Sequence, residues 1–133
     1  MPPPSPHPVL PSPPRVVIVD ADRRVQDSLA DLLGVSGDLM VVGRAGDVRS
    51  ALEIVERTQP DAVLIDPRLP DIEAGEALMT GLALAWPELR IVLTGWADVD
   101  GHSLPSAPRS RYVSKSASPD AFVAAIAAAC VAT

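Results

Sequence analysis

Five short apolar runs, separated by longer segments with helical spacing, constrain the fold of this chain more than any other feature. Each run is rich in Val, Ile or Leu and has the length of a strand that is buried on both faces. The expected strands cover residues 15–20, 39–46, 62–66, 90–95 and 111–115. The expected helices cover residues 23–34, 47–60, 73–87 and 118–132. The alternation predicts an α/β domain built on a doubly wound, five-stranded parallel sheet with helices on both faces.

Helix starts and helix faces follow from the same pattern. Asp47 and Ser118 stand where a side-chain oxygen can accept a hydrogen bond from the first amides of the second and the last helix. Val48, Leu52 and Val55 recur at helical spacing, which predicts that they face the core. Residues 96–110 contain two prolines and a glycine, so we expect the fourth crossover helix to be short or irregular.

The N-terminal segment differs from the rest in composition. Residues 2–14 hold eight of the fifteen prolines, and proline fixes φ and lacks an amide donor. We therefore expect residues 1–14 to be a disordered or polyproline-like tail and residues 15–133 to be the folded domain. A solvated leader is favoured over a binding role for this tail.

Charge and composition limit the partners. The net charge of −6 argues against direct nucleic-acid binding, which requires a clustered basic surface. The single cysteine excludes an internal disulfide and a cysteine zinc cluster. No apolar run reaches the length of a membrane span, and the proline-rich start is no secretory signal. The expectation is a soluble cytoplasmic protein that contacts neither nucleic acid nor membrane.

Polar residues follow the apolar runs at their carboxyl ends, where ligands collect in parallel sheets. Asp20 ends the first strand with Asp22 close behind, Asp66 ends the third, Thr94 the fourth and the only lysine, Lys115, the fifth. Clustered carboxylates can share Mg²⁺, while an ammonium and a hydroxyl can bind phosphate oxygens. The constellation indicates phosphoryl transfer to a carboxylate, with Asp66 as the nucleophile.

These residues stand in motifs that resemble a known family. "VVIVDAD", "PDAVLIDPRLPD", "IVLTG" and "RYVSKSASPDAF" occur in order over residues 15–132. In this the chain resembles the receiver domain of bacterial two-component response regulators. The resemblance implies a flavodoxin-like sandwich and a signalling domain rather than an enzyme.

The resemblance also assigns roles. Asp66 is implied as the acceptor of a phosphoryl group from a histidine kinase or a phosphotransfer protein. Thr94 is implied as the switch hydroxyl, Lys115 as the lysine on the phosphoryl group and Tyr112 as the aromatic residue that rotates on activation. The backbone carbonyl of Arg68 is implied as a ligand of Mg²⁺.

One departure from the family pattern concerns the metal. The family usually carries two adjacent acids after the first strand, whereas this chain has Asp20 followed by Ala21. Asp20, Asp66 and the Arg68 carbonyl remain as implied ligands, and Asp22 is a hypothetical substitute for the missing acid. Its alternative role is a helix cap. We expect weaker Mg²⁺ binding, or phosphorylation that is slow or absent.

The last helix suggests an interface. Asp120 is its only charged residue, and Phe122 and Ile126 are expected to face the core. Exposed apolar surface of this kind often marks a contact with another protein. In the family the last strand and helix belong to the signalling surface, so we expect a homodimer or a target protein there. The residues expected on the outer side are Val123, Ala124, Ala127 and Ala128.

Three functions remain open. The favoured one is a stand-alone receiver that is phosphorylated on Asp66 and signals by protein contact. The second is a degenerate receiver that binds a partner without phosphorylation. The third is a phosphatase of the haloacid dehalogenase type, with Asp20 as nucleophile and Asp22 as general acid. We disfavour it because only Asp120 follows Lys115, where that family has an acidic pair.

Overall fold

The computed structural model describes residues 13–69, 71–95, 110–115 and 118–131. Within these ranges five strands form one parallel sheet in the order β2-β1-β3-β4-β5. The strands are β1 (Arg15–Val19), β2 (Met40–Ala45), β3 (Ala62–Ile65), β4 (Arg90–Gly95) and β5 (Ser110–Ser114). The helices are α1 (Arg23–Ser36), α2 (Val48–Thr58), α3 (Ile72–Ala85) and α4 (Pro119–Val131). The predicted fold class is confirmed, while the segment expected to carry an irregular fourth crossover helix lies mostly outside the described residues.

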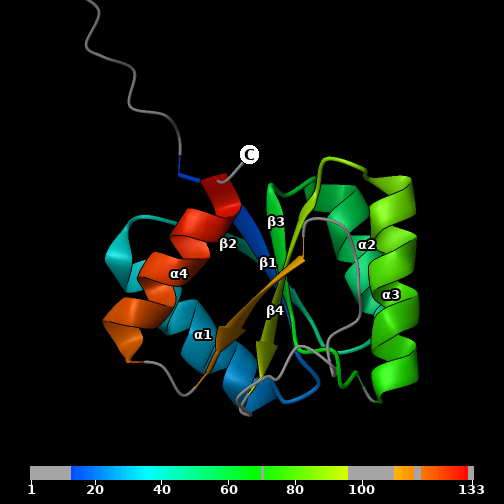
Figure 1. The fold of residues 1–133 in the computed structure, drawn as a ribbon, viewed down its shortest axis with the longest axis horizontal. Coiled ribbons are helices and arrows are strands. Elements are labelled where there is room, and N and C mark those ends of the chain that lie inside the picture. The colour runs from blue at the N-terminus through cyan, green and yellow to red at the C-terminus, as the bar shows by residue number, and fades with distance from the viewer. Residues whose placement is uncertain (1–12, 70, 96–109, 116–117, 132–133) are drawn as a thin grey trace, which may run out of the picture.

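The helices cover the sheet from both sides. Helices α1 and α4 lie on one face, and α2 and α3 lie on the other (Figure 1). Along β1, Val16 and Ile18 join the core beneath α1 and α4, whereas Val17 and Val19 join the core beneath α2 and α3. Apolar side chains are therefore needed on both faces of the strand, which explains the continuous run in the sequence.

One residue of α2 that was expected to face the core lies on the outer side of the helix. Helix α2 buries Ala51, Ile54 and Val55, while Leu52 is 36% exposed. The helix approaches β2 closely at Gly43, where an added Cβ atom would lie 2.5 Å from Cγ1 of Ile54. This approach turns Ile54 inward and Leu52 outward.

Helix α4 shows the opposite error. Val123, which was expected on its outer side, is buried together with Phe122, Ile126 and Ala129. These four residues fall at the i, i+1, i+4 and i+7 positions of one helical face, which rests on the sheet and α1.

Several helix starts are fixed by side chains, as the sequence predicted for two of them. The carboxylate of Asp47 accepts a hydrogen bond from the amide of Ser50 at 2.7 Å. The hydroxyl of Ser118 accepts one from the amide of Ala121 at 3.3 Å. Asp71 caps α3 in the same way. No helix in the described part of the chain is long and apolar enough to cross a bilayer.

Candidate functional site

The sheet brings Asp20, Asp66 and Lys115 together at the carboxyl ends of its strands, which we call the acid edge or carboxyl edge. Each follows the last residue of its strand, and each backbone amide donates to a carbonyl of the neighbouring strand. These bonds run from Asp20 to Ala45 at 3.0 Å, from Asp66 to Val19 at 3.0 Å and from Lys115 to Gly95 at 2.7 Å. The bonds extend the parallel ladder by one residue, so the three side chains start from fixed backbone positions.

The side chains of these residues meet directly, although 95 positions separate the first from the last. Nζ of Lys115 lies 2.5 Å from Oδ2 of Asp20 and 2.9 Å from Oδ2 of Asp66. The exposed fraction is 3% for the Lys115 side chain, 5% for Asp20 and 16% for Asp66. One ammonium therefore pairs with two largely buried carboxylates, which leaves the three side chains with a net charge of −1, and Asp66 is the more accessible of the two acids.

The other oxygen of each carboxylate accepts a hydrogen bond from the backbone amide two residues later. Oδ1 of Asp20 accepts a hydrogen bond from the amide of Asp22 at 2.9 Å. Oδ1 of Asp66 accepts one from the amide of Arg68 at 3.0 Å. Such turns fix the orientation of an aspartate. Both carboxylates are thus held between a backbone amide and a shared ammonium.

Thr94 and Tyr112 occupy the neighbouring strands. The pair Ile65 and Leu93 is in register between β3 and β4, and Asp66 and Thr94 are the next residues of their strands. Thr94 is 1% exposed, so its hydroxyl side chain is buried beside the acid edge. Tyr112 belongs to β5, two residues before the strand ends, but its side chain lies outside what the structure describes.

Asp22 does not join the other two acids. Its side chain is exposed and accepts a hydrogen bond from the amide of Arg24 at 2.8 Å, which caps α1. The donors that remain at the edge are the carboxylates of Asp20 and Asp66. Within the described residues, no three His, Cys, Asp or Glu side chains lie close enough to hold a metal ion. Two carboxylates that already face one cation nevertheless fit Mg²⁺, which typically takes one or two carboxylates and fills the remaining positions with water or phosphate oxygens.

Gly75 was not recognised from the sequence. An added Cβ atom there would lie 1.8 Å from the carbonyl oxygen of Pro67, the residue after Asp66. The first turn of α3 therefore lies directly on the backbone of the loop after Asp66 (residues 67–69), and Leu69 anchors the same loop with no exposed surface. The available signal was a glycine inside an otherwise good helical segment, which often marks a close backbone approach.

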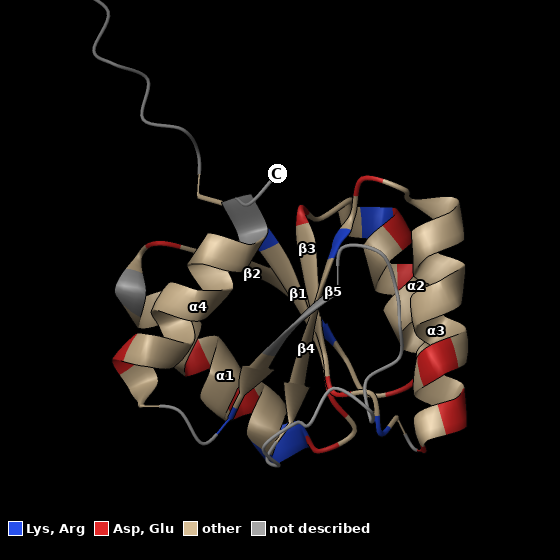
Figure 2. Cartoon of the chain, in the orientation of Figure 1, with Lys and Arg blue, Asp and Glu red and all other residues tan. Residues whose placement is uncertain are grey.

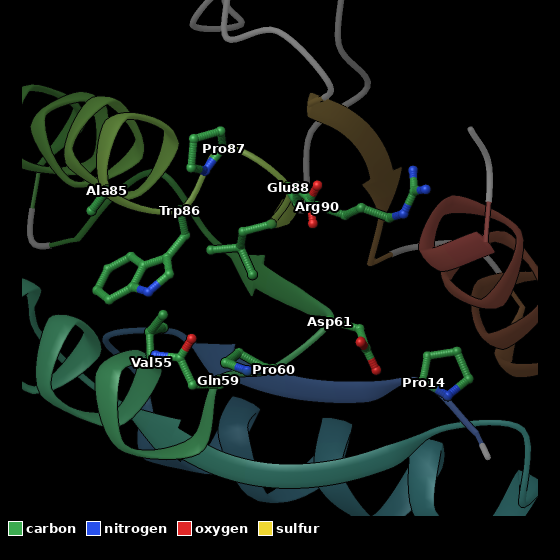
Figure 3. A pocket seen from close by; sticks show the side chains of 11 residues that line it. Pro14, Val55, Gln59, Pro60, Asp61, Ala85, Trp86, Pro87, Glu88 and Arg90 are labelled. Carbon is green, nitrogen blue, oxygen red and sulfur yellow. The ribbon is translucent and has the colours of Figure 1, made fainter.

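The amino ends of the strands, which we call the amino edge, border a cleft. The cleft has a volume of about 750 Å³ and lies between the ends of α2 and α3. Figure 3 shows the indole of Trp86 above Val55 and Gln59 at one end of this cleft and Pro14 at the other. Neither Asp20 nor Asp66 lines it, so the cleft is separate from these two carboxylates.

Comparison with known proteins agrees with this geometry. The model of the response regulator receiver domain matches residues 16–127. The DNA-binding transcriptional activator DevR/DosR of Mycobacterium tuberculosis is 40% identical over 83 residues, which are 62% of this chain and 38% of that protein. The uncharacterized transcriptional regulatory protein YhcZ of Bacillus subtilis is 30% identical over 112 residues, which are 82% of this chain and 51% of that protein. This chain thus spans about half or less of the length of these two relatives.

Solved structures show the same fold. The receiver domain of the putative response regulator NarL from Mycobacterium tuberculosis has a TM-score of 0.79 at 23% identity, over 92% of this chain and all of that one. A response regulator of the LuxR family from Aurantimonas has a TM-score of 0.79 at 27% identity, over 90% of this chain and 86% of that one.

Proposed function

Since this chain belongs to the response regulator receiver domain family, we propose that it accepts a phosphoryl group on Asp66 from a histidine kinase or a phosphotransfer protein. The phosphorylated receiver then signals by contact with other proteins. The observation that carries this proposal is the pairing of Asp66 with Lys115 at the end of β3. The carboxylate is oriented, it faces an ammonium that it shares with Asp20, and it is more exposed than Asp20.

The transfer step follows from these contacts. One carboxylate oxygen of Asp66 attacks phosphorus, and the bond between phosphorus and the donor's imidazole nitrogen breaks with its electron pair on that nitrogen. The ammonium of Lys115 is close enough to move from the carboxylate to a phosphoryl oxygen, where a charge-assisted hydrogen bond forms. The hydroxyl of Thr94, on the neighbouring strand, is the proposed switch group, which donates a hydrogen bond to the new phosphoryl group. Tyr112 is the proposed aromatic partner of that switch.

Mg²⁺ is the cofactor we propose for this edge, held by Asp20, Asp66 and the backbone carbonyl of Arg68. When bound, it would neutralise charge on the transferring group. Asp22 becomes a ligand only if its carboxylate leaves the start of α1. The substitution Asp22→Ser retains a capping oxygen but removes the carboxylate. Calorimetric titration with Mg²⁺ should therefore give a similar Kd for Asp22→Ser and the wild type, and a much weaker one for Asp20→Asn. Equal weakening by both would identify Asp22 as a ligand.

The test of phosphorylation uses acetyl phosphate with Mg²⁺ and intact-mass spectrometry. We expect one phosphoryl adduct on the wild type and none on Asp66→Asn, which keeps the size of the side chain and its acceptor oxygen for the Arg68 amide. An adduct that persists on Asp66→Asn would refute the assignment.

A second candidate is a receiver that binds its partner without phosphorylation. Ala21 supports it, because one acid usual in the family is missing. The Lys115 ammonium supports it too, because it already forms an ion pair with each carboxylate. This function predicts no adduct under any donor and equal binding of the partner by the wild type and Asp66→Asn.

The proposed contact surface is the outer side of α4 together with β5. Figure 2 shows α4 almost free of charged residues over its described length, and Asp120 is the only one in its sequence. Among the α4 side chains that the structure describes, up to Ala129, the exposed residues beyond the first turn are all alanines, and they suit close packing against a second copy or a target protein. Sedimentation at high micromolar concentration, with and without phosphodonor, should show a dimer; a monomer in both conditions would exclude the homodimer. The exposed alanines are Ala121, Ala124, Ala125 and Ala128.

A further inference from the structure

A groove runs along the free edge of the sheet, between α1 and β2. It has a volume of about 710 Å³, and most of the side chains that line it are small or aliphatic. Ala30 and Gly34 of α1 form one wall, while Val41 and Val42 of β2 form the floor. In the described part of the chain, β2 pairs only with β1, so its outer edge carries backbone groups without a strand partner.

The two ends of the groove differ. At one end the groove is lined by Arg44 of β2, which forms an ion pair with Asp27 of α1 and so links the strand to the helix. At the other end the lining includes Pro13, the first described residue. The carbonyl of Pro14 accepts a hydrogen bond from the amide of Met40 at 2.8 Å, which fixes the chain at this position. The proline-rich N-terminal segment therefore joins the fold at the open end of the groove.

The groove also contains space that the described residues leave empty. An added Cβ atom on Gly34 or on Gly37 would meet no other atom within 4 Å. Gly34 lies inside α1, where a glycine destabilises the helix relative to alanine. Met40, an aliphatic residue on the floor, is 48% exposed. A further apolar segment can pack here without displacing anything.

The N-terminal segment has the length and the chemistry to do so. Val9 and Leu10 interrupt its prolines and serines with two adjacent aliphatic side chains, which water solvates poorly. In the polyproline conformation each residue rises by about 3.1 Å, so the three steps from Pro13 back to Leu10 can span about 9 Å. The four steps from Met40 to Arg44 span about 13 Å at the rise of a strand, so Leu10 reaches the middle of the groove.

We propose that Val9 and Leu10 of this chain's own N-terminal segment bind in the groove between α1 and β2 and cover the free edge of the sheet. The backbone carbonyls of a polyproline-like segment have no internal partners and can accept hydrogen bonds from the outer amides of β2. The prolines on either side supply no amides of their own, which prevents the covered edge from recruiting a further strand.

The test compares amide spectra of the full chain with those of Gly34→Leu, which fills the groove. The matched control is Gly81→Leu, because Gly81 also lies inside a helix and has no atom within 4 Å of an added Cβ. We expect Gly34→Leu to move the Val9 and Leu10 amide signals to those of a free peptide of residues 2–14. Gly81→Leu should leave them unchanged.

The reciprocal change is Val9→Ser with Leu10→Ser. We expect it to shift the amides of Gly34, Val41 and Val42, whereas Pro2→Ser with Pro3→Ser leaves them in place. Shifts confined to residues 2–14 would overturn the proposal. Groove shifts that appear only as the protein concentration is raised would overturn it too, because they would assign the groove to the segment of a second copy.

Discussion

The two edges of the same sheet use charged residues in opposite ways. At the carboxyl edge, Asp20, Asp66 and Lys115 are largely buried and bind one another. At the amino edge, the carboxylate of Asp61 accepts a hydrogen bond from the backbone amide of Arg15 at 2.8 Å, and Asp61 is exposed. The guanidinium of Arg15 donates to the carbonyls that end α2, at 2.7 Å for Thr58 and 3.1 Å for Gln59.

The two edges differ in whether water can replace an interaction that a substitution removes. Water reaches the amino edge and can bind whatever a substitution leaves unpaired, so each bond there has a small net effect. Water hardly reaches the carboxyl edge, where an unpaired charge remains uncompensated. A substitution that unpairs a charge should therefore cost more stability at the carboxyl ends of the strands than at their amino ends.

The largest expected effect is that of Lys115→Met. The substitution leaves two buried carboxylates without their ammonium, and carboxylates about 4 Å apart repel by roughly 4 kcal/mol at an effective dielectric constant of about 20. We expect the free energy of unfolding at neutral pH to fall by about 3–5 kcal/mol in urea titrations. Adding Asp20→Asn should restore most of the loss; equal stability of the single and double variants would show that burial of charge is not the cause.

Gly75→Ala tests the support of the acceptor loop. Its Cβ atom would overlap the Pro67 carbonyl, so the loop or α3 must move. We expect a loss of about 1–3 kcal/mol and slower phosphorylation of Asp66. Gly81→Ala in the same helix is the control, and it should raise stability by up to about 1 kcal/mol because helix propensity improves without a clash.

Asp61→Ala tests the amino edge. The substitution removes the acceptor of the Arg15 amide, which water can then bind. The free energy of unfolding should fall by only about 1 kcal/mol, and the rate of phosphorylation by acetyl phosphate should stay at the wild-type value. A fall in the free energy of unfolding as large as that of Lys115→Met would contradict the proposed difference between the two edges.

The smallest effect concerns pH and Asp47. The backbone amide and the hydroxyl of Ser50 lower the pKa of the Asp47 carboxyl below its ordinary value, with a lesser contribution from Arg49. The folded-state pKa is thus below that of the unfolded chain, so the stabilisation is present above about pH 4 and is lost as the pH falls through the folded-state pKa. NMR titration of the carboxyl should show this depression, and Asp47→Ala should weaken the acid dependence of stability. An ordinary pKa would contradict the capping interaction.

The parts of the fold that depend on chain order could be predicted from the sequence. Continuous apolar runs fix the parallel sheet, and a parallel sheet brings residues 20, 66 and 115 to one edge without any knowledge of side-chain packing. Helix faces were harder. Leu52 satisfies the helical spacing with Val48 and Val55, but the buried residue is Ile54, which lies close to Gly43 of β2.

The role of Asp22 and the packing of Gly75 were the parts of the site that the sequence did not settle. Asp22 stands where the sequence permits both a metal ligand and a helix cap, and the structure shows the cap, in which its carboxylate accepts a hydrogen bond from the amide of Arg24. Gly75 was missed because its contact is with Pro67, eight residues earlier and outside the helix. Contacts of this kind depend on how a helix approaches a loop, which no residue pattern within one element encodes.

The central claim is that Asp66 is the group that forms the acyl phosphate. Its most direct test is reduction of the phosphodonor-treated protein with borohydride, which converts an aspartyl phosphate to homoserine, followed by peptide mass spectrometry. We expect homoserine at position 66 and nowhere else. Homoserine at position 20, or at no position, would contradict the account.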